Sequence, residues 1–229
     1  MSFTRCLSFS LCAVLLTCLP AAATNLVTGN GFGFAVVFPQ TGTATKFYAH
    51  PYSFVRPDPR NPLSEGIESA NFIKSLGWVD APAHGASADY DEDSHVIHVR
   101  SSAGDGFVVM PFGLQRPALV ISWQPGSATA SPGNFEVEWS HPVTTHKVVL
   151  ISGTKIALLQ FDGIEESLLL IPLGAKRANA AGEQQYLASS MAWALVSLEK
   201  EGELEQTVRE FNQWRAGLAP GALVKREIA

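Results

Sequence analysis

The sequence predicts a mainly β protein, an antiparallel β-sandwich followed by a C-terminal amphipathic helix. Three observations lead to this fold class. Apolar residues recur with a period of two or in short runs rich in β-branched and aromatic side chains. Turn-forming Gly, Pro, Asn and Asp separate these runs, and almost no helical pattern precedes residue 199. Many short strands joined by turns favour stacked antiparallel sheets over a βαβ array.

Residues 1–23 have the features of a cleavable signal peptide. Arg5 precedes the apolar run at residues 11–16, and Ala21 and Ala23 satisfy the A-x-A pattern before a cleavage site. The run is too short for a membrane-spanning helix. We therefore expect cleavage after Ala23 and a secreted or periplasmic product, with lipidation at Cys18 as the alternative.

All cysteines of the chain lie within this segment, at positions 6, 12 and 18. The exported product therefore has no thiol nucleophile, no disulfide and no thiolate metal site. The chain carries a net charge of −5, which becomes −6 when Arg5 is removed with the signal peptide. Nucleic-acid binding needs a clustered basic face. The acidic, evenly spread charge argues against it.

Residues 24–199 are expected to form the β-sandwich domain. The alternating segment 135–139 should expose one face to water, and the wholly apolar stretch 168–171 should be a central strand buried on both faces. The expected strands span residues 32–38, 45–49, 75–79, 95–100, 106–110, 118–123, 135–139, 147–151, 155–161, 168–173 and 192–198.

Two irregular stretches, at residues 50–72 and 80–94, interrupt this pattern. The first is rich in proline and aromatic residues, and long irregular connections in compact domains are often functional. Aromatic rings interleaved with polar side chains are typical of sugar-binding surfaces, although the rings of such a loop also pack onto their own domain. The candidate carbohydrate-binding residues are Tyr48, His50, Tyr52, Arg56 and Trp78.

The C-terminal segment, residues 200–229, changes to a helical period. Its apolar stripe needs a packing partner, because a helix of this length is marginal alone. Gly217 and Pro220 should end the first helix, and the segment after them begins a second helical pattern. We therefore expect a truncated helical linker. The residues expected to pack against a partner are Leu204, Val208, Phe211, Trp214 and Leu218.

The stretch Gly-Asn-Gly-Phe-Gly-Phe at residues 29–34 has glycines in a G-x-G arrangement. A dinucleotide fingerprint requires a strand before it and a helix after it, whereas a strand pattern follows here. We therefore interpret it as a turn that enters the first expected strand, with glycine permitting positive φ and close backbone approach.

This opening motif, the aromatic and proline-rich stretch after it and the terminal amphipathic helix together resemble the N-terminal domain of six-hairpin glycosidases. That group includes glucoamylase-like hydrolases and disaccharide phosphorylases. The resemblance implies a β supersandwich, similar in fold to galactose mutarotase, joined by linker helices to a catalytic (α/α)6 barrel. The catalytic carboxylates of those families lie in the barrel. We therefore expect no catalytic residue in this chain, and glycoside hydrolase activity only in a longer protein that contains it.

The acidic residues and histidines offer weak alternatives. Asp162, Glu165 and Glu166 surround an Asp-Gly pair typical of a hairpin turn. The acidic loop near Asp91 lacks EF-hand spacing, and the histidines lack the three-ligand arrangement of a catalytic zinc site. We expect no metal and no cofactor.

The expected function is a non-catalytic module that braces a catalytic barrel and contacts carbohydrate. The expected partners are carbohydrate and a helical catalytic domain or other protein, with no nucleic acid and no membrane after cleavage. One alternative is a mutarotase-like sugar epimerase. It would use His98 or His146 with Glu136 or Glu138. The other is a scaffold that binds another protein through residues 204–229.

Overall fold

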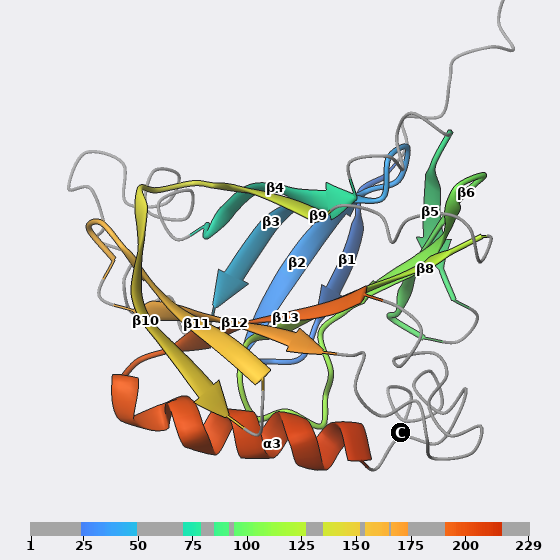
Figure 1. Cartoon of the computed structure of the whole chain (residues 1–229). Coiled ribbons are helices and arrows are strands. Elements are labelled where there is room, and N and C mark those ends of the chain that lie inside the picture. Colours follow the sequence, from blue (N-terminus) through green and yellow to red (C-terminus); the bar gives the residue numbers. More distant parts are fainter. Residues whose placement is uncertain are drawn as a thin grey trace, which may run out of the picture.

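The computed structural model describes residues 24–49, 71–78, 85–91, 94–126, 135–151, 154–164, 166–173 and 191–216. They form three layers, in which two antiparallel sheets face one another and a helix lies across the outer face of the larger sheet (Figure 1). The predicted mainly β sandwich with a C-terminal helix is confirmed. Residues 1–23, expected to be a signal peptide, lie outside the described residues.

The smaller sheet has five strands in the order β1-β2-β3-β4-β9. Its strands are β1 (Leu26–Gly29), β2 (Gly33–Phe38), β3 (Thr43–Ala49), β4 (Ile73–Trp78) and β9 (Phe135–Trp139). Every neighbouring pair is antiparallel. On β9, Glu136 and Glu138 are exposed and alternate with half-buried apolar residues, as the sequence pattern predicted.

The larger sheet has eight strands in the order β10-β11-β12-β13-β8-β7-β6-β5. Its strands are β5 (Ser87–Tyr90), β6 (Ile97–Ser101), β7 (Gly104–Val109), β8 (Ala118–Pro125), β10 (Val143–Ile151), β11 (Thr154–Phe161), β12 (Ser167–Leu173) and β13 (Met191–Leu198). The sequence missed two strands, β1 and β5. Each has only four residues, too few to establish a period.

The part of the larger sheet that lies between the smaller sheet and α3 is apolar on both faces, because each face covers a core there. The inner core, between the sheets, contains Phe47, Phe72 and Phe161. Strand β12 contributes Leu168 to the inner core and Leu169 to the outer core. This confirms the prediction of a central strand buried on both faces.

The outer core lies between the larger sheet and α3 (Leu204–Ala216), which follows the short 3₁₀ turn η2 (Glu201–Glu203). The predicted stripe of Leu204, Val208, Phe211 and Trp214 is buried in this core, with Phe211 only 1% exposed. The partner of the stripe is therefore the sheet of this same chain. Leu218 lies outside the described residues.

The turn between β1 and β2 contains the glycine motif and anchors a distant loop. The buried Asn30 amide donates hydrogen bonds to the carbonyl oxygens of Pro111, Leu114 and Arg116, and its Oδ1 accepts one from the amide of Phe32. Gly31 has φ +82° in this turn. The motif is a turn, as predicted, but it joins two strands instead of preceding the first.

The loop held by Asn30 in turn holds the helix. Arg116 Nη1 lies 3.3 Å from Glu203 Oε2, and Arg116 Nε lies 3.6 Å from Glu210 Oε2. A Cβ on Gly113 would lie 2.9 Å from Trp214 Cδ1, so the indole packs directly on this backbone. The helix is thus fixed to the sandwich by a buried apolar stripe and by a cation between two carboxylates.

Candidate functional site

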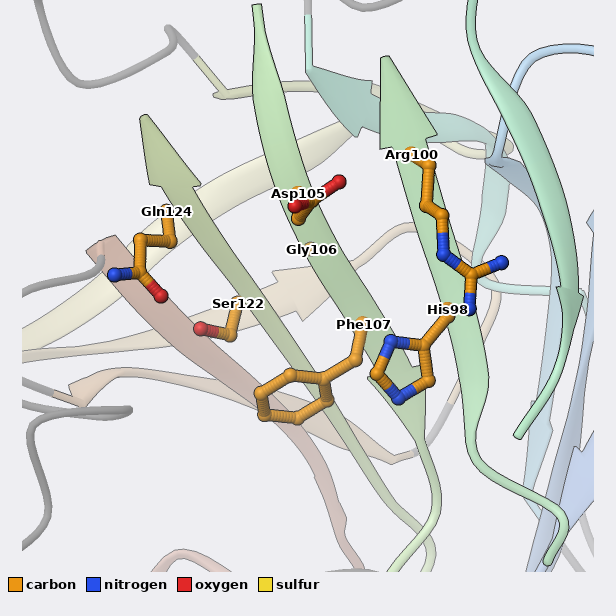
Figure 2. Close-up of a pocket in the computed structure, with 7 residues that line it drawn as sticks. All are labelled: His98, Arg100, Asp105, Gly106, Phe107, Ser122 and Gln124. Atoms are coloured by element: carbon orange, nitrogen blue, oxygen red, sulfur yellow. The ribbon is translucent and has the colours of Figure 1, made fainter. Parts of the chain in front are cut away.

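A polar hollow lies on the outer face of β6, β7 and β8 (Figure 2). Its volume is about 190 Å³. Ligand pockets for drug-sized molecules are usually about 300–1,000 Å³. The hollow therefore suits one small polar group. It is lined by His98, Arg100, Asp105, Gly106, Phe107, Ser122 and Gln124.

Strand register assembles the hollow from two cross-strand rows. In the first row, His98 on β6 pairs with Phe107 on β7, which pairs with Ser122 on β8. The second row lies two residues along each strand. Because side chains two apart on a strand point to the same face, both rows face outward together.

The second row places a cation, an anion and an amide side by side. Arg100 pairs with Asp105, and Asp105 pairs with Gln124. All three side chains are exposed. Arginine only donates hydrogen bonds, ionised aspartate only accepts them, and glutamine does both. The row therefore offers both kinds of hydrogen-bonding group to one ligand.

The first row forms the base of the hollow. Phe107 is fully buried and Ser122 is 2% exposed, so the Phe107 ring offers no free face for stacking. His98 is half-buried, and its Nε2 lies 3.6 Å from Asp91 Oδ1. Arg100 Nη1 likewise lies 2.5 Å from Asp89 Oδ1. Arg100 and His98 thus each have a carboxylate beside them.

Gly106 lies between the two rows and is packed from below. A Cβ at this position would lie 2.4 Å from the Ser122 carbonyl oxygen and 2.9 Å from Trp123 Cε3. Trp123 in turn packs on Trp78, with ring centroids 5.0 Å apart. The tryptophan pair therefore supports the strands of the hollow from the inner core.

The predicted carbohydrate-binding residues that the structure describes, Tyr48 and Trp78, do not line the hollow. Trp78 is 4% exposed and Tyr48 is 3% exposed, with the Tyr48 ring stacked on Phe34 at 4.8 Å between centroids. Both rings belong to the inner core, so neither offers a face to a sugar in this structure. His50, Tyr52 and Arg56 lie outside the described residues.

The histidines and glutamates of the epimerase alternative do not converge. His98 is on β6 in the larger sheet, whereas Glu136 and Glu138 are on β9 in the smaller one. Glu138 Oε1 lies 3.1 Å from Lys74 Nζ. His146 Nε2 lies 3.5 Å from Glu201 Oε2. Each histidine therefore has a carboxylate neighbour other than the two that this alternative requires.

Among the described residues, Glu201 and His95 have displaced pKa values. A hydrogen bond from Lys147 to Glu201 holds the pKa of this carboxyl below its usual range, and the charges of Lys147 and His146 add to the effect. Burial lowers the pKa of His95, whose ring stacks on Phe112 at 4.4 Å between centroids. Neither group lines the hollow.

The acidic turn between β11 and β12 is a hairpin, as its Asp-Gly pair predicted. Gly163 has φ +75° within it. Glu166 is buried and accepts a hydrogen bond from Ser197 Oγ. Glu165 lies outside the described residues.

Among the residues that the structure describes, no three His, Cys, Asp or Glu side chains gather as metal ligands. Nor is any described helix long and apolar enough to span a bilayer.

Sequence reasoning missed Arg100, Asp105, Ser122 and Gln124 as site residues. Each lies in or beside an apolar segment, where a polar residue at every second position is the ordinary signature of an exposed strand face. Only the register of β6, β7 and β8 shows that these positions adjoin.

Comparison with known proteins adds no assignment, because no protein-family profile matches the chain and no curated protein matches it.

Proposed function

We propose that this chain is a non-catalytic β-sandwich module of a secreted glycosidase-like protein, and that it contacts carbohydrate at the polar hollow. The observation that carries the proposal is the row of Arg100, Asp105 and Gln124, three adjacent exposed side chains on neighbouring strands. A sugar ring presents several hydroxyl groups, each a donor and an acceptor. A row that combines donors and acceptors at strand spacing is complementary to such a ring.

The charge of the hollow favours a neutral ligand over an anion. Arg100 lies against Asp89 and pairs across the strand with Asp105, and His98 lies against Asp91. An anion would have to compete with these carboxylates. Neutral hydroxyl groups are instead bound well by ionised side chains, because hydrogen bonds that involve a charged partner are stronger than neutral ones.

The size of the hollow favours one sugar unit at the end or side of a chain. Its volume of about 190 Å³ leaves no room to enclose an oligosaccharide. Phe107 is buried, so hydrogen bonding rather than ring stacking would supply the affinity. We therefore expect weak binding, of the kind that positions a substrate near another domain.

The bracing role rests on the rigidity of the helix attachment and on the resemblance to six-hairpin glycosidases. Four apolar residues of α3 are buried against the larger sheet, and Arg116 lies between Glu203 and Glu210. A helix held this firmly can transmit the orientation of the sandwich to whatever follows it. The signal-like residues 1–23 support the secreted location.

Calorimetric titration of the full chain with neutral glucans, xylans and galactans tests the carbohydrate contact. We expect binding to at least one of them, and we expect Gln124→Ala to weaken it about fivefold. This corresponds to about 1 kcal/mol for one lost hydrogen bond. The matched control is Gln206→Ala, which removes an exposed amide on α3 that donates to Glu210 and does not line the hollow.

Two results would count against the proposal. One is the absence of heat with every glycan class at high ligand concentration. The other is binding that Gln124→Ala and Gln206→Ala change equally, because the hollow would then not be the contact surface.

A further inference from the structure

A sandwich of two open sheets has four edge strands, and natural proteins protect such edges from pairing with other chains. Here β1 and β9 flank the smaller sheet, and β5 and β10 flank the larger one. Three of the four edges carry a recognisable protective feature. The fourth, β10, differs from them in length and in composition.

The protected edges are short. The hydroxyl of Tyr90 accepts a hydrogen bond from the Val27 amide at 2.6 Å and donates one to the Val27 carbonyl at 2.9 Å, which caps β1. On β5 the Ala88 amide donates to the Pro39 carbonyl at 2.7 Å. Strand β9 has five residues, two of them the exposed Glu136 and Glu138. Short length, capping and charge each oppose pairing with another strand.

Strand β10 has nine residues, Val143–Ile151, and its sequence has a high β propensity. Val148 is 58% exposed and Leu150 is 68% exposed. It pairs with β11 on one side, and its other side makes no backbone hydrogen bond to another residue that the structure describes. A long, exposed and apolar edge of this kind is a template for strand addition.

The one charge in the apolar half of β10 is compensated. Lys147 is the type of residue that usually prevents edge pairing. Its Nζ lies 2.9 Å from Glu201 Oε1, at the start of the helical segment. A register shift between Thr145 and Lys147 bends the first half of the strand, which leaves Lys147–Ile151 as the regular part.

We propose that β10 pairs with β10 of a second copy of this chain, antiparallel and centred on Val149. Val149 is the midpoint of the regular stretch Lys147–Ile151, so a two-fold axis at Val149 pairs all five residues of the stretch with the partner subunit. Val148 would lie opposite Leu150 of the partner subunit, and Lys147 opposite Ile151 of the partner subunit. The exposed apolar side chains are thereby covered, and the two lysines lie at opposite ends of the pairing.

The choice of a second copy follows from this self-complementarity. A pairing centred on Lys147 would place two like charges directly opposite each other, which destabilises a strand pair. A pairing centred further toward Val143 would include the bulge. The Val149-centred pairing avoids both. It joins two eight-stranded sheets into one continuous sheet, with a helix from each copy on the same face.

Sedimentation of the full chain over a concentration series tests the proposal. We expect a dimer, and we expect Leu150→Lys to convert it to a monomer. The matched control is Val27→Lys, an exposed apolar position (45% exposed) on the capped β1 edge, which should leave the dimer intact. Circular dichroism of each variant establishes that the sandwich is folded.

A cysteine variant tests the register. In a full chain with Cys6, Cys12 and Cys18 replaced by Ser, no other thiol remains. Val149→Cys should form an intermolecular disulfide under mild oxidation, since residues opposite each other in antiparallel strands have Cα atoms close enough for one. Lys147→Cys should not, because its counterpart lies at the far end of the pairing.

A dimer that Leu150→Lys dissociates and that Val149→Cys cross-links supports the proposal. A monomer at all concentrations overturns it, and so does a folded dimer that Leu150→Lys leaves intact. A disulfide formed by Lys147→Cys but not by Val149→Cys would overturn the register.

Discussion

Asn30 is a buried side chain whose amide group joins two loops that are far apart in the sequence. Its Nδ2 donates to three carbonyl oxygens, at Pro111, Leu114 and Arg116, with distances of 3.1, 3.5 and 2.7 Å. An unpaired buried carbonyl loses its solvation without compensation. Asn30 therefore supplies the hydrogen-bond donor for three carbonyl groups of the loop that contacts the helix.

Replacing Asn30 should therefore be costly. We expect Asn30→Ala to lower the free energy of unfolding by about 2–3 kcal/mol, because the carbonyls of Pro111 and Arg116 lose a buried donor. Urea denaturation followed by tryptophan fluorescence measures the change. The matched control is Asn25→Ala, at an exposed position just before β1, where a change within about 0.5 kcal/mol is expected. Equal effects in the two variants would contradict the role assigned to Asn30.

His95 makes the stability of the fold depend on pH. Burial lowers its pKa in the folded state below the ordinary value of 6.5, so the folded state favours the neutral ring. Below pH 6.5 the unfolded chain binds a proton that folded His95 does not, and stability falls as the pH falls. Above that pH the contribution of the neutral ring is fully present.

This behaviour can be measured by comparing unfolding midpoints at about pH 8 and about pH 5.5. We expect His95→Gln to reduce the loss of stability between the two conditions. His146→Gln serves as the control, because it likewise replaces one imidazole, at an exposed position of β10. An unchanged pH profile in His95→Gln would show that another group is responsible.

At the scale of elements, α3 depends on the sheet beneath it. A 13-residue helix is marginal in isolation, and its stability in proteins comes mainly from the packing of its apolar face. Phe211 is the most deeply buried residue of the stripe, and its ring meets Trp214 edge to face at 6.3 Å between centroids. We therefore expect Phe211 to contribute the most of the four stripe residues to the stability of the outer core.

We expect Phe211→Ala to cost about 3–5 kcal/mol of unfolding free energy, as is typical of removing a buried aromatic ring. Thermal unfolding monitored by circular dichroism measures it. Gln213→Ala, two residues along on the exposed face, should change the midpoint little. If Phe211→Ala were equally mild, the helix would not be integral to the domain.

At the scale of the whole molecule, the two ends of the sandwich differ. At one end the edges β1 and β5 are joined through the Tyr90 hydroxyl, which closes the gap between the sheets. At the other end β10 projects with its apolar residues exposed. One end is closed by hydrogen bonds within the chain, and the other is the place where we propose that a second copy adds.

Most strands and the helix could be predicted from local sequence patterns. Alternation along β9 and the apolar run of β12 each predict one strand and the faces that it buries, and both are confirmed. The helix period likewise identified Leu204, Val208, Phe211 and Trp214 as one stripe. The short strands β1 and β5 gave no period, and the sequence missed them.

The candidate site could not be predicted in this way. Arg100, Asp105 and Gln124 lie on three successive strands, and only the hydrogen-bonded register makes them neighbours. Tyr48 and Trp78 were candidates for a sugar-binding surface, because aromatic residues beside an irregular stretch suit either a binding surface or a local core. Their burial depends on the facing sheet, which no local pattern records.

The sequence by itself determined the class of fold, the order of most strands and the apolar face of the helix, because these follow from side-chain periods of two and 3.6 residues. The tertiary structure alone decided which strands are neighbours, what covers the helix stripe and which polar side chains meet in the hollow. The physical reason is that strand pairing joins residues far apart in the chain through backbone groups, which are the same in every residue except proline.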